Sequence, residues 1–461
     1  MPRNGSVLCA IAIAAPWISA LVLVALHQRY VRLVAVAACS LCIIISGLLL
    51  RNIAPAESLG PVLMVLFSCL SLGATLVLPR RDCHGRTMSG LLFILGSTLL
   101  AYSAGNLLLL LAAWILSTVP FFVSRWLPPR TWRPQAGLLF SSVALALAIA
   151  VIAANGHSMA IAELGGRNPG GASVFALLVI AVMFRKGICP AHAWVADAVE
   201  SGSPIPIALL LNGHFGALLV AKLIVPLFPR TATNLFPVLS YLALITALYV
   251  AIRAVSENSP RRLLAFVALS QSACILAGLE SRTAEGITGA FVHWFVVTAS
   301  TMGLFGILRL LEVRFGENLS AGTHLGLAEH APRLAVFFAV FGLALVGLPG
   351  TLSFCSQDLL IHGTLSSHPL TGLLLPIATA MNAVSIFRLF ARLFLGKRRT
   401  GFTVMADALP RERWILTVGV LFVVLGGLFP NAIVGAVNVS SRSGQQNQNE
   451  NDKLEYPVFA R

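Results

Sequence analysis

Apolar runs long enough to cross a membrane follow one another along most of the chain, separated by short polar connections. About 20 apolar residues are what a helix needs to span the hydrocarbon layer. The pattern predicts an all-α polytopic membrane protein with about fourteen transmembrane helices, at residues 5–27, 31–50, 59–79, 88–104, 106–126, 135–155, 172–199, 204–226, 234–253, 262–280, 286–311, 333–362, 370–396 and 413–438.

Two of these runs are longer than a bilayer requires, and each is interrupted by proline. The run at 172–199 is broken at Pro190, and the run at 333–362 is broken at Pro349 and Gly350. Proline removes a backbone donor, and the carbonyl groups that it frees are tolerated at membrane depth only where they face protein or water. Paired broken helices in two halves of a chain indicate the ion path of a transporter.

The Lys and Arg residues are concentrated in every second connection. Connections after odd-numbered helices carry 20 of them, whereas connections after even-numbered helices carry only Arg51, Arg167, Arg230 and Arg282. Because cytoplasmic loops hold the excess of Lys and Arg, the odd connections are predicted to be cytoplasmic. Both termini are then expected on the outer, periplasmic side of a bacterial inner membrane.

Composition excludes a water-soluble globular protein. Hydrophobic residues make up 57% of the chain and charged residues 11%, against about 25% charged in soluble domains. The net charge of +15 lies in loops between apolar runs, so we expect the lipid bilayer and no nucleic acid as a partner. No nucleotide loop, flavin site, haem pair or iron–sulfur cysteine pattern is present in the sequence. We predict no cofactor, no metal and no catalytic centre in this chain.

Ionisable residues inside the apolar runs are the candidates for function, because each costs about 2.5–3.5 kcal/mol at mid-membrane. We predict that an ion pathway involves Arg185, Lys186, Asp197, His214, Lys222, His293, Asp358 and His362. Arg185 and Lys186 are two adjacent cations beside the break at Pro190. His214, expected midway along an otherwise apolar helix, titrates near neutral pH and could relay protons with Lys186. Lys222 and Arg388 also fit interfacial anchors.

The segment around the first break resembles a known family. Arg185 lies five positions before Pro190, and His192, Trp194 and Asp197 follow. This pattern is similar to that of the antiporter-like, proton-conducting subunits of respiratory complex I and of Mrp-type cation/proton antiporters, in which a lysine takes the place of Arg185.

Further motifs extend the resemblance to roughly residues 88–400. They are the run 261–266 with Ser270 and Gln271, the second break at 347–354, and the run 106–110 leading to Trp114. The resemblance implies two inverted five-helix repeats, each with a broken helix. We predict N-terminal helices at 1–87, antiporter-like repeats at 88–226 and 234–396, a C-terminal helix at 397–438, and a flexible polar tail at 439–461.

The chain also departs from the family pattern. The glutamate that pairs with the seventh-helix lysine is replaced by Ile115, and the lysine expected after His293 is replaced by Val297. His214 takes the place of the eighth-helix lysine, and Gln357 that of a basic residue in the second broken helix. Because Arg185 is always charged, it cannot exchange a proton.

The leading functional hypothesis is a subunit that translocates ions, and most simply protons, within a multi-subunit membrane complex related to NADH:quinone oxidoreductase or Mrp antiporters. Its partners would be other membrane subunits, and its cargo protons or monovalent cations. Any redox step would belong to other subunits. Two alternatives stay open: the membrane subunit of a two-component inorganic-carbon uptake complex, and a degenerate structural paralogue that moves no ions.

Overall fold

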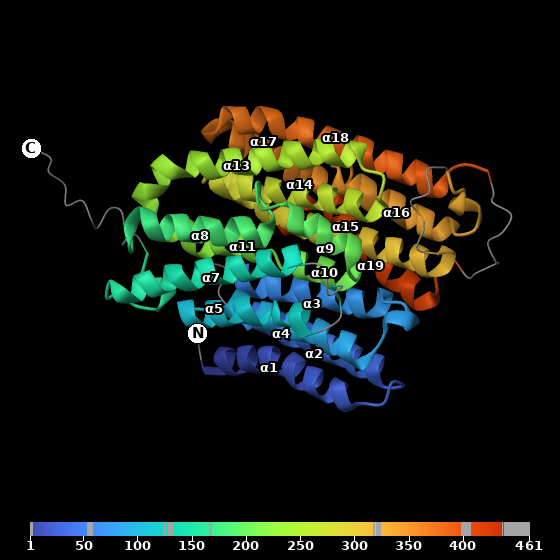
Figure 1. The fold of residues 1–461 in the computed structure, drawn as a ribbon, viewed down its shortest axis with the longest axis horizontal. Coiled ribbons are helices and arrows are strands. Elements are labelled where there is room, and N and C mark those ends of the chain that lie inside the picture. Colours follow the sequence, from blue (N-terminus) through green and yellow to red (C-terminus); the bar gives the residue numbers. More distant parts are fainter. Residues whose placement is uncertain are drawn as a thin grey trace, which may run out of the picture.

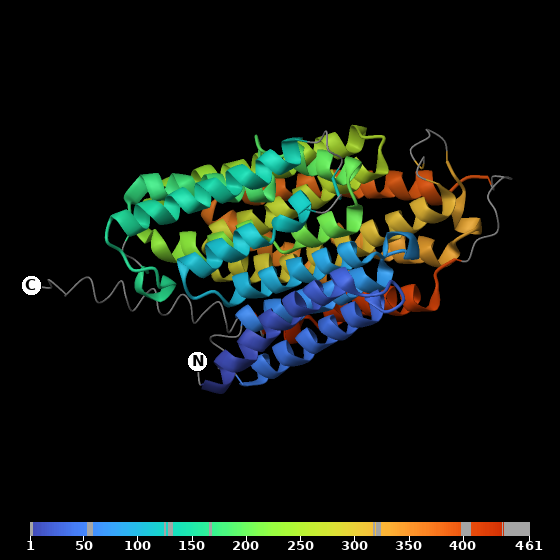
Figure 2. The same cartoon turned by 60° about the horizontal axis from the view of Figure 1, so that its bottom comes forward.

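The computed structural model describes residues 3–52, 59–123, 126–127, 132–165, 168–316, 319, 324–397, 407–435 and 437. Within these residues the structure is a single bundle of roughly parallel helix axes and contains no β-strand (Figures 1 and 2). The prediction of an all-α polytopic architecture is confirmed. The predicted tail at 439–461 lies outside the described residues.

Helices and short helical turns succeed one another along the whole described chain. The first part contains α1 (Arg3–Ala25), α2 (Val31–Asn52), α3 (Leu59–Val77), η2 (Arg80–Asp82), α4 (Gly85–Ser103), α5 (Leu107–Leu116), α6 (Val119–Val123), α7 (Trp132–Ala154), η3 (Ile161–Glu163), α8 (Gly171–Lys186), α9 (Ala193–Ser201), α10 (Pro204–Asn212), α11 (Phe215–Leu219), η4 (Val220–Ile224) and α12 (Val225–Leu227). The second part contains α13 (Pro229–Ser256), α14 (Pro260–Glu280), α15 (Ala284–Phe315), η5 (Leu327–Glu329), α16 (Pro332–Leu345), α17 (Leu352–Ser367), α18 (Pro369–Phe394) and α19 (Pro410–Leu428).

Each predicted apolar run coincides with one of these helices or with an interrupted helix. Nine helical segments of the described chain are long and apolar enough to cross a membrane. The total of fourteen crossings stays a prediction.

Both predicted helix breaks are present. Helix α8 ends at Lys186 and α9 begins at Ala193, so Pro190 lies in the connection between them. Gly187 ends α8 with φ +72°, a left-handed conformation that glycine adopts without steric cost. The second break separates α16 from α17 and contains Pro349 and Gly350.

A further interruption lies where we expected a continuous helix. The run at 204–226 stops at Gly213, and His214 has φ +43° before α11 begins. The π-helical turn η4 then follows, with Lys222 in it. The predicted helix at 204–226 is therefore interrupted at His214, because apolar length and periodicity do not report a single left-handed residue.

Another predicted helix, at 106–126, is also interrupted. Two polar residues, Ser117 and Thr118, separate α5 from α6. Ser117 Oγ donates to the Trp114 carbonyl oxygen and Thr118 Oγ1 donates to that of Ile115. Hydroxyl groups that bond to nearby carbonyls compete with the helical ladder. The predicted helix at 106–126 is accordingly two short helices.

Charged side chains join several connections at one end of the bundle. Arg309 Nε and Nη2 donate to the two carboxylate oxygens of Asp82 over 2.7 and 3.0 Å. Glu312 accepts from Arg261 over 2.6 and 2.7 Å and from Arg309 over 3.1 Å. These residues belong to three of the connections that the charge pattern assigns to the same side, so the structure places those connections at one end.

Helices α14, α15 and α17 pack against one another, and small residues let their backbones approach closely. A Cβ added at Gly363 of α17 would lie 2.2 Å from the backbone nitrogen of Gly286 in α15. The backbone atoms at this contact cannot move aside as a flexible side chain would. Gly363 is therefore a position where only the absence of a side chain allows the observed packing.

We predict that Gly363→Ala lowers the free energy of unfolding by about 1–3 kcal/mol, because the added methyl group forces α17 away from α15. Thermal unfolding of the full chain in detergent measures this as a lower midpoint. Gly47→Ala in α2 is the matched control, since a Cβ there meets nothing within 4 Å. Equal midpoints for the two variants would contradict the close contact.

Candidate functional site

Two adjacent cations end helix α8 inside the bundle. Arg185 is 5% exposed and Lys186 is 4% exposed. The last carbonyl groups of a helix carry partial negative charge, which favours cations at this end. None of the ion pairs in the described part of the chain includes either residue.

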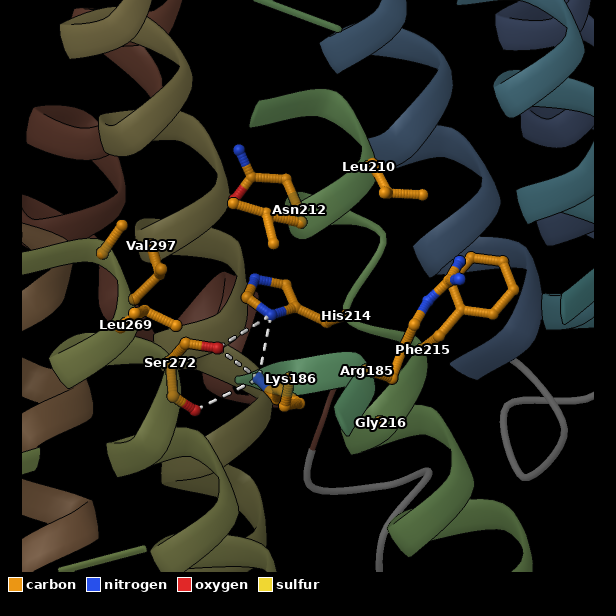
Figure 3. A pocket seen from close by; sticks show the side chains of 12 residues that line it. Arg185, Lys186, Leu210, Asn212, His214, Phe215, Gly216, Leu269, Ser272 and Val297 are labelled. Carbon is orange, nitrogen blue, oxygen red and sulfur yellow. Dashed lines mark hydrogen bonds between the residues drawn. The ribbon is translucent and has the colours of Figure 1, made fainter. Parts of the chain in front are cut away.

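Lys186 is held by three neutral acceptors (Figure 3). Its Nζ lies 3.0 Å from His214 Nδ1, 2.5 Å from Ser272 Oγ and 3.1 Å from the Ser272 carbonyl oxygen. An ammonium group has three N–H donors, so this set can satisfy it completely without a carboxylate. The close approach of Lys186 and His214 agrees with the proposed pairing of these two residues.

His214 reaches Lys186 from the break between α10 and α11. It is 3% exposed, and its ring lies edge-on to Trp294 with the ring centroids 5.1 Å apart. Nδ1 faces Lys186, whereas Nε2 is buried with no hydrogen-bond partner among the described residues. A neutral imidazole can accept a proton at one nitrogen and release one from the other.

Arg185 points to a different side of α8 from Lys186. Ser117 Oγ accepts a hydrogen bond from Arg185 Nη2. The guanidinium carbon lies 5.3 Å from the ring centroid of Trp114 and 4.7 Å from that of Phe215. Aromatic faces stabilise a cation at such distances. Nη1 is buried and has no hydrogen-bond partner in the described chain.

A small cavity lies beside these residues. Its volume is about 30 Å³, and its polar lining comes from Arg185, Lys186, Asn212, His214 and Ser272. This volume can hold about two water molecules. Figure 3 shows Asn212 on the side of the imidazole that faces away from Lys186. All five of these polar side chains are buried within the bundle.

His293 lies in a second buried polar group next to the first. Its Nε2 donates to Gln271 Oε1 over 3.0 Å, and its Nδ1 lies 3.0 Å from Ser356 Oγ of α17. Gln271 is adjacent to Ser272, which contacts Lys186. Gln271 and Ser272, adjacent in α14, therefore contact His293 and Lys186 respectively.

Asp197 and Lys222 lie away from this cavity. Asp197 accepts from Arg133 over 3.3 Å and from Arg262 over 3.2 Å, and it lines a surface cleft of about 320 Å³. Lys222 Nζ donates to the carbonyl oxygen of Tyr102 over 3.2 Å. The Tyr102 hydroxyl donates in turn to the carbonyl oxygen of Gly213, next to His214.

Asp358 and His362 lie on the exposed face of α17. Their carboxylate and imidazole are 3.5 Å apart, and the two side chains are 63% and 70% exposed in this single chain. Phe354 and Leu365, 48% and 44% exposed, flank them along the same helix. The structure does not bring this pair to Lys186.

None of the three positions Ile115, Val297 and Gln357, where the chain departs from the family pattern, supplies a carboxylate to the site. Ile115 is 42% exposed, although the preceding Trp114 is fully buried. Val297 lines the cavity beside His214. Gln357 donates to Ser353 Oγ over 3.2 Å within its own helix.

Sequence reasoning missed Ser272 and Ser117, the hydroxyl partners of the two cations. Ser272 follows Ser270 and Gln271, and three consecutive polar residues in an otherwise apolar helix are a signal that could have been noticed. Ser117 had no comparable signal. A single serine near a helix end is common, and its role depends on where α8 packs.

Comparisons with known proteins agree with this architecture. Residues 136–382 match the family described as NADH:quinone oxidoreductase/Mrp antiporter, TM. NADH-quinone oxidoreductase subunit M of Mycobacterium tuberculosis is 28% identical over 282 residues, covering 59% of this chain and 50% of that protein. Subunit M of Rickettsia prowazekii is 26% identical over 312 residues, covering 65% of this chain and 63% of that protein. The chain thus spans about half the length of the first of these curated relatives.

Two solved structures share the fold. A chain of respiratory complex I from Thermus thermophilus matches with a TM-score of 0.82 and 21% identity, over 95% of this chain and 99% of that one. A chain of the Mrp complex from Dietzia sp. matches with a TM-score of 0.83 and 18% identity, over 95% and 97%. Since the family match covers more than half of the 461 residues, the chain belongs to the NADH:quinone oxidoreductase/Mrp antiporter transmembrane family.

Proposed function

We propose that this chain is an ion-translocating, proton-conducting membrane subunit of a multi-subunit complex related to NADH:quinone oxidoreductases and Mrp antiporters. The observation that carries the proposal is the 3.0 Å contact of Lys186 Nζ with His214 Nδ1, between two buried side chains that line one cavity. Both groups can bind and release a proton, and neither is committed to a carboxylate.

In the proposed relay, the proton passes between Lys186 and the imidazole of His214. The imidazole takes the proton at Nδ1 and releases one from Nε2, which lies on the other side of the ring. Asn212 lies on that side, and its Oδ1 already accepts from Thr301 Oγ1 over 3.0 Å. Water in the cavity would bridge Nε2 to this polar group.

Arg185 has a separate role in the proposed relay. Its guanidinium stays charged, so it does not carry the proton. Its fixed positive charge, on the residue next to Lys186, opposes a second full charge on Lys186. The other predicted pathway residues, Asp197, Lys222, His293, Asp358 and His362, remain proposals with the positions given above.

The wider assignments belong to the same proposal. We place the protein in a bacterial inner membrane with both termini on the periplasmic side, on the strength of the charge bias of its connections. The division into repeats at 88–226 and 234–396 is supported by the presence of one broken helix at α8–α9 and one at α16–α17.

Partner subunits are expected at the lateral faces of the bundle. The patch of Phe354, Asp358, His362 and Leu365, here named the α17 patch, combines apolar and charged side chains on an exposed face. Charged groups on a lateral surface are costly against lipid and favourable against a polar partner. The α17 patch therefore supports assembly with another membrane subunit.

A second candidate function is a structural subunit that assembles without conducting ions. The observations that favour it are the absence of a carboxylate at Ile115, whose side chain is partly exposed, and the apolar Val297 in the cavity. The two functions differ in proton flux.

We predict that Lys186→Met and His214→Asn each lower proton flux at least tenfold in liposomes containing the full chain, measured with a pH-sensitive dye after a pH jump. Each variant removes one titrating member of the relay. Asparagine is chosen because it tolerates the left-handed backbone of His214 better than most residues.

The control for these variants is Lys397→Gln, which removes an exposed cation after α18 and should leave the flux unchanged. Unchanged flux in both Lys186→Met and His214→Asn would contradict the relay. A wild-type chain without flux, alone and in its purified complex, would favour the structural function.

We predict that the double substitution Asp358→Leu and His362→Leu reduces the recovery of neighbouring membrane subunits severalfold when the tagged full chain is purified from its own membrane in mild detergent. Removal of both charges deletes the polar part of the α17 patch without touching the core. Lys397→Leu is the matched exposed control. Undiminished recovery, with the thermal midpoint of the variant unchanged, would show that the α17 patch is not an interface.

A further inference from the structure

We propose that the cavity beside Arg185 and Lys186 binds a small monovalent anion of the size of chloride. The inference concerns a ligand that stays in place, and it does not depend on whether the chain conducts protons. The anion would supply the negative charge beside Arg185 and Lys186 that no carboxylate of the described residues provides.

The first argument is the charge balance of the interior. Arg185 is buried and stays charged, and Lys186 is the next residue. A buried charge without a counter-charge is strongly unfavourable, because the protein interior solvates it poorly. The aromatic faces of Trp114 and Phe215 and the hydroxyl of Ser117 offset only part of this cost.

The second argument is the donor character of the lining. Arg185 and His214 both line the cavity. Their atoms Nη1 and Nε2 are buried, and neither atom has a hydrogen-bond partner in the described chain. The Lys186 ammonium, whose three N–H groups bond to His214 and Ser272, adds positive charge to the lining. No aspartate or glutamate is among the described residues that line the cavity. A site of donors without carboxylates favours an anion over a cation.

The third argument is size. A volume of about 30 Å³ holds about two waters, which is compatible with a halide ion and too small for a metabolite with several carbon atoms. Water alone would satisfy the free donors but would bring no charge. The difference between an anion and water is therefore measurable as a dependence on the kind of salt.

The test uses the full chain in lipid nanodiscs, in sodium gluconate buffer into which sodium chloride is exchanged at constant ionic strength. An anion that binds the folded state raises the thermal midpoint saturably. We expect this rise with chloride and with bromide, and its loss in Arg185→Gln. The exposed control Arg86→Gln should keep it.

Equal midpoints in chloride and gluconate would overturn the proposal, as would an undiminished chloride effect in Arg185→Gln. If Arg185→Gln does not fold, crystals of the wild-type chain grown in bromide provide the second measurement. An anomalous bromine peak between Arg185 and His214 is the expected result. A cavity with water alone would contradict the proposal. Lys186→Met flux tests the relay separately, so the two ideas can fail independently.

Discussion

A cation inside a membrane protein must find acceptors or a counter-charge, because hydrocarbon solvates it far more poorly than water does. In this chain Lys186 meets that requirement with His214 Nδ1 and two oxygens of Ser272, all neutral. Breaks in the helices make this arrangement possible. Gly187 ends α8 directly after the cation, and His214 occupies the interruption between α10 and α11.

The chain belongs to the family, but its residues at two key positions differ from the family pattern. The resemblance implies a lysine whose proton affinity is set by a nearby glutamate, but this chain has Arg185 and Ile115 at those positions. The imidazole of His214 is instead the partner of Lys186, the residue next to Arg185. Proton exchange between an amine and an imidazole moves one positive charge and needs no separation of opposite charges.

Sequence pattern predicted the helices and the breaks at Pro190 and Pro349, because proline and apolar length act locally. It also led to the hypothesis that Lys186 and His214 form a relay, since an ionisable side chain in an apolar run costs free energy in the membrane. It could not predict that Ser272 completes the lysine site or that His214 interrupts its helix, because both depend on how α8, α10 and α14 pack. Asp358 and His362 share the same sequence signal as Lys186, yet the fold places them on an outer face.

The most direct test of the account is a double-mutant cycle between Lys186 and His214, with Lys186→Met and His214→Asn measured singly and together by unfolding in lipid nanodiscs. If the two side chains act as a hydrogen-bonded pair, the double variant should be clearly less destabilised than the sum of the single variants, with a coupling energy of about 0.5–3 kcal/mol. Strictly additive effects would contradict the pairing on which the account depends.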